Sequence, residues 1–286
     1  GDTIIILGFN PVSDIHWGHL VIFKIAQFFQ MNYKSYVLIV IPDEEAYIIG
    51  NKPAEYFHKK SLTLVNQIAA LGFNKKRTFF LVDSLFPDVY NLAVKFSKNV
   101  NLNTLQAIYG FKKKHCLGMF FLPIIQCAQI LLPQIIFKNL KGTLTIIGAN
   151  EDAHLRLCRD LATKNHLVKP AIAYIQYIPG LDGKPMSRKR SESAIFIFED
   201  VVNIKNKIAK ALTGGQKSIK EQKDKGGSMA NCVVFKYLRL FEEINEASIK
   251  LECESGQRLC YECKNKLKDL VTHELAEDLL SEEVAE

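Results

Sequence analysis

Two patterns of hydrophobic positions alternate over roughly the first two thirds of the chain. Short runs rich in β-branched and aromatic residues have the length of buried strands. They lie at residues 3–7, 36–41, 78–82, 144–147 and 171–177. Longer stretches at 18–31, 55–71 and 153–165 carry apolar residues at helical spacing. This alternation predicts an α/β fold in which crossover helices connect the strands of a parallel sheet.

The pattern changes near residue 199. Beyond it no run has the character of a strand, and lysine-rich helical stretches surround two glycine pairs, at 214–215 and 226–227. The last residues are mainly acidic. We therefore expect a second domain that is helical throughout.

Composition narrows the class of protein. Glycine and proline together are fewer than a tenth of the 286 residues and 48% are hydrophobic, which excludes collagen-like and wholly disordered chains. Seven cysteines are an odd number for a disulfide framework and favour reduced thiols. The most apolar stretch, 120–137, is broken by prolines and glutamines. We expect a cytoplasmic protein with neither a signal peptide nor a membrane span.

The net charge of +7 mildly favours an anionic partner. Part of this charge is concentrated in the predicted helical domain. Such a cluster is either a solvated helix face or a contact surface for an RNA backbone. The lysines concerned are Lys205, Lys207, Lys210, Lys217, Lys220, Lys223 and Lys225.

The segment that follows the first strand carries the clearest chemistry. Asn10 and Pro11 lead to His16, Gly18 and His19, where an apolar helix begins. A helix N-terminus attracts anions, and a glycine lets a flat base approach the backbone. Two histidines three residues apart share a helix face and can donate hydrogen bonds to phosphate oxygens. A metal site without an evident third ligand and a purely structural pair are the alternatives.

Residues 16–19, His-Trp-Gly-His, resemble the HIGH motif of class I aminoacyl-tRNA synthetases, and residues 183–191 resemble the KMSKS loop of the same enzymes. Further stretches make the chain similar to the tryptophanyl-tRNA synthetases of eukaryotes and archaea. They lie at 102–111, 116–126, 148–160, 179–183, 193–196 and 214–240.

This resemblance implies a Rossmann-like parallel-sheet catalytic domain at 1–198. It also implies a helical insertion at about 46–141 that forms a homodimer, and an all-α C-terminal domain at 199–286 that resembles anticodon-binding domains. The implied reaction activates an amino acid, tryptophan by resemblance, with ATP and transfers it to tRNA. Mg²⁺ enters with ATP, and no protein metal ligand is expected.

The resemblance also assigns residues to roles. Those expected to act in catalysis are His16, His19, Lys184, Ser187 and Lys189. Those expected to bind ATP are Asn10, Pro11, His16, Gly18, His19, Gly148, Asn150, Met186 and Ser187. Those expected to bind the amino acid are Ile6, Val40, Glu45, Gln126 and Glu151.

Some of these positions depart from the family pattern. Pro185 stands where the KMSKS loop begins with lysine, and Asn150-Glu151 stands where the family usually has Asp-Gln. Eukaryotic members recognise the indole N–H with a tyrosine and a glutamine, and the matching residues here are Ile6 and Val40. We therefore consider two hypotheses: an active synthetase, and a non-catalytic relative that still binds RNA or nucleotide.

A second cluster of potential ligands lies near the C-terminus. Cys253, Cys260, Cys263 and His273 have a spacing that fits zinc, and it equally fits cysteines packed along an ordinary helix. Both interpretations stay open at the level of sequence.

Overall fold

The computed structural model describes residues 3–12, 14–137, 139–148, 151–175, 178–186, 188–241 and 244–280, with the side chains of 188–189 and 276–280 outside the description. The chain forms two compact units. Unit 1 comprises Gly1–Ser13 and Ile22–Gln176, and unit 2 comprises Asp14–Val21 and Tyr177–Glu286. This division differs from the expected boundary at 198/199, which stays a prediction about folding domains.

Unit 1 is built on a five-stranded parallel sheet in the order β3-β2-β1-β4-β5. The strands are β1 (Thr3–Gly8), β2 (Tyr36–Ile41), β3 (Thr78–Val82), β4 (Gly142–Gly148) and β5 (Ala171–Ile175). Each covers one of the predicted runs, so the parallel α/β fold is confirmed. Residues 176–177 of the last predicted run lie outside the described residues.

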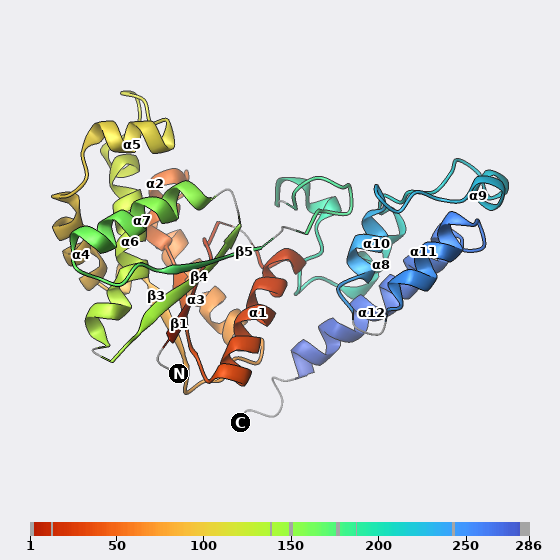
Figure 1. Cartoon of the computed structure of the whole chain (residues 1–286), viewed down its shortest axis with the longest axis horizontal. Helices are drawn as coiled ribbons and strands as arrows, with labels where there is room; N and C mark the ends of the chain where they lie inside the picture. Colours follow the sequence, from red (N-terminus) through yellow and green to blue (C-terminus); the bar gives the residue numbers. More distant parts are fainter. Residues whose placement is uncertain are drawn as a thin grey trace. The chain divides into compact units, whose positions relative to one another are not determined.

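Helices cover both faces of this sheet (Figure 1). They are α1 (Trp17–Tyr33), α2 (Asp43–Ile49), α3 (Ala54–Ala69), α4 (Asp88–Ser97), α5 (Leu102–Tyr109), α6 (Leu117–Ile136) and α7 (Asp152–Lys164), with the short 3₁₀ helix η1 (Asp83–Leu85). Ile4 and Ile6 of β1 pack in one core with residues of α4, α6 and α7. Ile5 and Leu7, which alternate with them, are also buried, so both faces of the sheet are covered, as in doubly wound α/β proteins.

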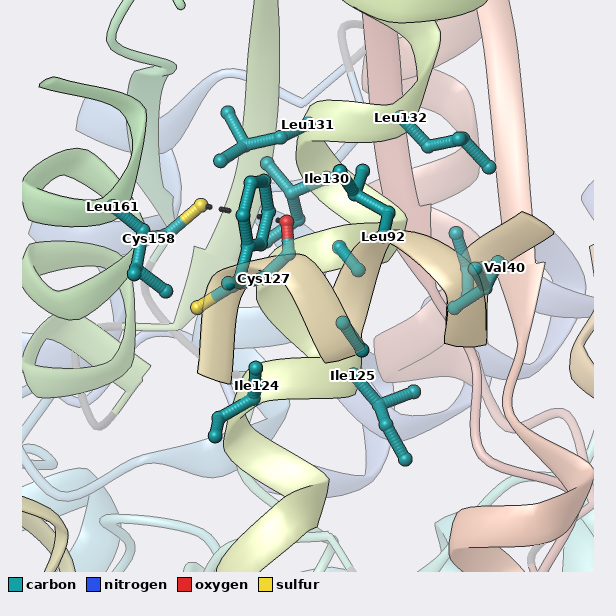
Figure 2. Packing of buried hydrophobic residues seen from close by; sticks show 14 of the residues in the cluster. Val40, Leu92, Ile124, Ile125, Cys127, Ile130, Leu131, Leu132, Cys158 and Leu161 are labelled. Carbon is teal, nitrogen blue, oxygen red and sulfur yellow. Dashed lines mark hydrogen bonds between the residues drawn. The ribbon is translucent and has the colours of Figure 1, made fainter. Parts of the chain in front are cut away.

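Helix α6 is the central helix of the unit 1 core. In Figure 2, Leu131 projects toward Cys158 and Leu161 of α7, whereas Leu132 projects from the other side of α6. By length and composition alone α6 could cross a membrane, but 61% of its most apolar window is buried inside the protein. Burial of this kind is what the core helix of a globular unit requires.

Unit 2 is helical. It contains the 3₁₀ segment η3 (Arg188–Ser193) and the helices α8 (Val201–Ala209), α9 (Ile219–Lys225), α10 (Val233–Leu238), α11 (Glu246–Glu254) and α12 (Cys260–Leu280). Side-chain caps begin several of them: Asp200 accepts from the N–H groups of Val202 and Asn203, and Ser218 accepts from Glu221. Among the described residues after 199 there is no strand.

The two glycine pairs of unit 2 are points of close backbone approach. A Cβ on Gly214 would lie 1.6 Å from the carbonyl oxygen of Ser228, whose N–H donates to Gly214 at 2.7 Å. Gly226 has φ +69°, and a Cβ there would lie 1.9 Å from the carbonyl oxygen of Glu254. Only glycine fits either position without moving the backbone.

Candidate active site

The strand order of unit 1 reverses between β1 and β4, which lie side by side at the centre of the sheet. Ligands of open α/β sheets bind beyond the carboxyl ends of the strands at such a reversal. The residues that end these strands here are Gly8 and Gly148. The fold therefore places Asn10, which follows Gly8, and the predicted ATP residue Gly148 at the edge where a ligand is expected.

Glu45 is held at this edge by two amide side chains. It lies in the first turn of α2, directly after β2. The Nδ2 of Asn10 donates to its Oε1 at 3.3 Å, and the Nε2 of Gln126 on α6 donates to its Oε2 at 2.7 Å. Three predicted site residues are thus joined in one hydrogen-bonded group. The Oδ1 of Asn10 accepts from the N–H of Val12, which fixes the orientation of the amide.

Burial raises the pKa of Glu45, the hydrogen bonds from Gln126 and Asn10 lower it in part, and the nearby charge of Glu151 raises it further. Glu151 itself is exposed. A half-buried carboxylate that is hydrogen-bonded yet still destabilised by burial is suited to receive a positive group. Glu45 and Glu151, both predicted to bind the amino acid, therefore contribute negative charge to this edge of the sheet.

A second carboxylate near Glu45, that of Asp83, was not predicted from the sequence. Asp83 follows β3 at once, is 1% exposed, and accepts from the Nε2 of Gln129 with both carboxylate oxygens at 2.8 Å. Burial, joined by the charges of Asp43, Glu45 and Glu44, raises the pKa of Asp83 to about 8. Gln129 follows Gln126 by three residues, and this helical spacing was the available clue.

The end of β2 carries a further polar contact that sequence reasoning missed. Asp43 accepts from the backbone N–H of Ser84 at 3.0 Å and from its hydroxyl at 2.5 Å. The Nδ1 of His58 lies 2.8 Å from that hydroxyl and 3.3 Å from the Asp43 carboxylate. One nitrogen makes both contacts, so this is a structural connection between α2, α3 and η1 and not a nucleophilic triad.

Two of the stretches that carry the family resemblance meet in the core. The hydroxyl of Tyr109, at the end of α5, lies 2.8 Å from the Nδ1 of His154 on α7. Burial lowers the pKa of His154 to about 4, so its imidazole is neutral near pH 7. Its Nε2 is buried without a hydrogen-bond partner among the described residues.

Ile6 and Val40, the expected positions for side-chain recognition, are 2% and 3% exposed. Both belong to the hydrophobic cluster between the sheet and α6. They can shape an apolar surface but offer no hydrogen bond to a ligand.

The histidine motif begins α1 and belongs to unit 2. The carbonyl of His16 accepts from the N–H of His19 at 2.8 Å, and the N–H of His16 donates to the Nδ1 of His19 at 3.2 Å. The two imidazoles stack with ring centroids 3.6 Å apart. The prediction that the two histidines share a face is confirmed.

Both imidazoles are neutral near pH 7. Burial lowers the pKa of His16 to about 4, and burial followed by the neighbouring His16 lowers the pKa of His19 to about 3. Because the Nδ1 of His19 accepts a hydrogen bond, its proton is assigned to Nε2, where it can be donated. The Nδ1 of His16 is buried with no hydrogen-bond partner among the described residues.

Gly18 keeps this pair in place. A Cβ at residue 18 would lie 3.2 Å from both the Nδ1 and the Cε1 of His16. Such a contact is tighter than ordinary packing and would press on the imidazole. The absence of a side chain at Gly18 therefore serves the position of His16.

The motif is fixed to the segment 194–197. His16 and Phe196 form an antiparallel bridge, and the N–H of Trp17 donates to the carbonyl of Ile195 at 2.8 Å. Lys207 contacts the same segment and is 9% exposed. It donates to Glu199 at 2.6 Å and to the carbonyl of Ala194 at 3.0 Å. One lysine of the predicted basic face is thus buried.

The expected lid loop is ordered by its own contacts. Pro179 and Pro185 form an antiparallel bridge, and the N–H of Gly180 donates to the carbonyl of Lys184 at 2.7 Å. Arg190 donates from Nε to Asp182 at 3.0 Å and from its terminal nitrogen to the carbonyl of Pro185. The charge of Arg190 therefore stabilises the loop itself.

The remaining predicted residues are placed as follows. Lys184 is exposed, Met186 is half-buried and Pro11 is buried. Ser187, Asn150 and the side chain of Lys189 lie outside the described residues. Within the described part of the chain no three His, Cys, Asp or Glu side chains form a group that could hold a metal ion, and the cysteines are free thiols.

The parallel sheet of unit 1 and the paired imidazoles at the start of α1 agree with the resemblance to class I aminoacyl-tRNA synthetases. The sequence profile of the family described as tRNA synthetases class I (W and Y) matches residues 1–276. The chain belongs to this family.

Individual relatives agree. The tryptophan–tRNA ligase of Methanocaldococcus jannaschii is 32% identical, over 96% of this chain and 76% of the relative. That of Thermococcus kodakarensis is 32% identical, over 94% and 71%. The crystal structure of tryptophanyl-tRNA synthetase from Aeropyrum pernix K1 superposes with a TM-score of 0.90 at 29% identity, covering 99% of this chain and 79% of that one.

Proposed function

We propose that this protein is a tryptophan–tRNA ligase, which uses ATP to activate tryptophan and transfers the aminoacyl group to tRNA. The observation that carries the proposal is the stacked His16–His19 pair, with a buried nitrogen that lacks a partner among the described residues, at the start of a helix. The curated relatives of the family bear the name tryptophan–tRNA ligase.

The first step joins two substrates without a protein nucleophile. A carboxylate oxygen of the amino acid attacks the α-phosphorus of ATP, the new P–O bond forms, and pyrophosphate leaves with the electrons of the broken bond. Catalysis then depends on placement and on stabilising negative charge at the phosphate oxygens.

We assign ATP to the histidine motif. Neutral imidazoles donate hydrogen bonds without adding a full charge, and the start of α1 provides backbone N–H groups and a partial positive charge. The buried Nδ1 of His16, which has no partner among the described residues, fits a group that brings its own hydrogen-bonding atoms. Gly148, at the end of β4, keeps its expected role in ATP binding as a proposal.

We assign the ammonium group of the amino acid to Glu45, with Gln126 and Asn10 holding the carboxylate in position. A hydrogen-bonded ion pair with a half-buried carboxylate contributes about 1.5–3 kcal/mol. Ile6 and Val40 would provide apolar contact to the side chain of the substrate. Recognition of an indole N–H would then fall to groups other than these two residues.

The loop at 179–190 would close over the phosphates. Lys184, which is exposed, supplies positive charge at its tip, whereas Arg190 supports the loop through Asp182. Pro185 fixes φ and lacks an N–H, which would stiffen this loop. Ser187 and Lys189 keep their expected roles as proposals.

The partners follow from the same assignment. The described residues hold no metal cluster, so Mg²⁺ would arrive with the triphosphate and be held by its oxygens. Lys205 and Lys210 on unit 2 are exposed, as are Lys217, Lys220, Lys223 and Lys225, and would contact the tRNA backbone. A homodimer through the range 46–141 and a cytoplasmic location are further parts of the proposal.

The test is ATP–pyrophosphate exchange with each of the twenty amino acids. Exchange stimulated by tryptophan alone is expected, followed by tRNA charging with the same amino acid. Exchange with none of the twenty would overturn the proposal.

One observation favours a second candidate, a non-catalytic relative that binds RNA or nucleotide. Ile6 and Val40, where the family resemblance leads one to expect polar recognition, are buried apolar residues. Such a protein would bind tRNA with a strong dependence on salt yet show no pyrophosphate exchange. The two measurements made on one sample separate the candidates.

A further inference from the structure

A cavity of about 170 Å³ lies in unit 1, lined by residues of β1, β2 and β3, by Phe86 and by the end of α6. Its inner wall consists of core side chains: Ile4 is 1% exposed, Leu132 4% and Leu38 8%. Every described residue that lines the cavity is apolar. It is an apolar pocket, closed by core side chains along its inner wall and open on its other side.

The cavity has a mouth that solvent molecules can reach. Phe79, Phe86, Ile136 and Phe137 line it and each keeps more than a third of its surface exposed. The rings of Phe79 and Phe137 pack against each other with centroids 5.8 Å apart. A ligand could enter past these rings without unfolding of a helix or strand.

A proline of α6 forms part of the cavity wall. Pro133 lies in the cavity wall, inside the helix, and provides no N–H for the helical ladder. A proline in the interior of a helix favours a bend.

The cavity is separate from the candidate active site. Gln126, which donates to Glu45, and Ile136, which lines the cavity, are both on α6. Ten residues at about 1.5 Å each put them about 15 Å apart along the helix axis. None of the residues assigned to ATP or to the amino acid lines the cavity.

We propose that this cavity is a binding site for one small uncharged hydrophobic molecule, of the size of a single aromatic ring or a short branched alkyl group. A cavity of roughly 150 Å³ lined by leucine, isoleucine and phenylalanine binds benzene. A charged ligand would lose its hydration without finding a partner. The lining side chains are all apolar. They could not hydrogen-bond the backbone of a partner protein that inserted a side chain into the cavity.

The test is a titration of the whole chain with benzene, followed by the NMR signals of methyl groups. Saturable shifts of Ile4, Leu38 and Leu132 are expected, and they persist when tryptophan and ATP are present in excess. Shifts that do not saturate, that are absent at these methyls, or that tryptophan and ATP abolish would overturn the proposal.

Neighbouring residues on α6 supply a matched pair of variants. Ile135 and Ile136 are 48% and 47% exposed, but only Ile136 lines the cavity. Ile136→Glu places a carboxylate at the mouth and should weaken benzene binding at least about tenfold, whereas Ile135→Glu should leave it within about twofold. Equal effects of the two substitutions would contradict the assignment.

A third variant keeps the test independent of the charge. Leu132→Phe fills the cavity from the inner wall with another apolar group and should also abolish the saturable shifts. Circular dichroism establishes that each variant is folded before titration. Retained binding in folded Leu132→Phe would place the ligand elsewhere.

Discussion

The carboxylates of unit 1 and the imidazoles of unit 2 are both removed from water, but their hydrogen bonding differs. Asp83 and Glu45 receive their hydrogen bonds from amide side chains of the same unit. The Nδ1 of His16 is buried and has no partner in the described part of the chain. An unsatisfied buried polar atom costs about 1–3 kcal/mol. The carboxylates thus already accept hydrogen bonds from the protein, whereas the histidine motif has a buried nitrogen suited to a ligand.

The largest expected effect concerns the support of the histidine motif. Lys207→Met leaves the half-buried Glu199 without its cation, so we expect a loss of about 3 kcal/mol in the free energy of unfolding. Urea unfolding followed by the fluorescence of Trp17, the only tryptophan of the chain, measures this loss. Lys205→Met, an exposed position on the same helix, is the control and should change stability by less than about 0.5 kcal/mol. Equal losses in both would mean that the pair does not support the motif.

Removal of either imidazole should reduce catalysis while sparing stability. His16→Ala and His19→Ala each remove a hydrogen-bond donor near the developing charge, for which a loss of about 10²–10³ in kcat is expected. Pyrophosphate exchange is the measurement. His115→Ala removes an imidazole from the loop before α6 and should leave exchange unchanged. Activity of the His19 variant within threefold of the unmodified protein (about 0.7 kcal/mol) would exclude this role.

A smaller effect is expected from the carboxylate that we assign to the substrate ammonium. Glu45→Gln should raise KM for tryptophan about 10- to 100-fold, because a charge-assisted hydrogen bond is replaced by a neutral one. KM for ATP should stay the same. Glu44→Gln, in the same turn of α2 but exposed, provides the control. An equal increase in both KM values would assign Glu45 to general structure instead.

The smallest effects, on the order of 1 kcal/mol per pH unit, have opposite signs in the two units. Asp83 has a pKa of about 8 in the fold, above its ordinary 3.8, so the folded state holds an extra proton and loses stability as the pH rises toward 8. His16 and His19 have pKa values of about 4 and 3, below the ordinary 6.5. Unit 2 therefore loses stability as the pH falls below about 6.5.

Residue-resolved hydrogen exchange measures the pH response of each unit separately. Amides of β3 should exchange faster at pH 8 than expected from the intrinsic rate, and Asp83→Asn should remove that change. Amides around Trp17 should be less protected at pH 5 than at pH 7. A common response of both regions to pH would show that the titrations are not local.

Sequence predicted the framework better than the polar contacts. The spacing of hydrophobic residues located the five strands of the sheet, because the pattern of burial along a strand is local in sequence. Asp83 and Gln129 are 46 residues apart and belong to no motif, so their pairing required the fold. Charge patterning placed Lys207 on a solvated or RNA-binding face, yet it is buried against Glu199, since lysine composition alone does not reveal a partner.

The site shows the same contrast. The family resemblance brought Glu45 and Gln126 together correctly, and the three-residue spacing of His16 and His19 predicted a shared face. The sequence could not indicate that the imidazoles of His16 and His19 stack or that burial keeps them neutral. Nor could it indicate that Arg190 supports its own loop. These properties depend on distant segments and on desolvation.

The binding of ATP by the histidine motif is the central claim, and an NMR titration of ¹⁵N-labelled histidines with MgATP tests it most directly. We expect saturable shifts of the His16 and His19 ring nitrogens, with the neutral forms retained at pH 7, and no shift of His115 or His166. If the His16 and His19 signals stay unmoved at concentrations that saturate nucleotide binding, the claim is contradicted.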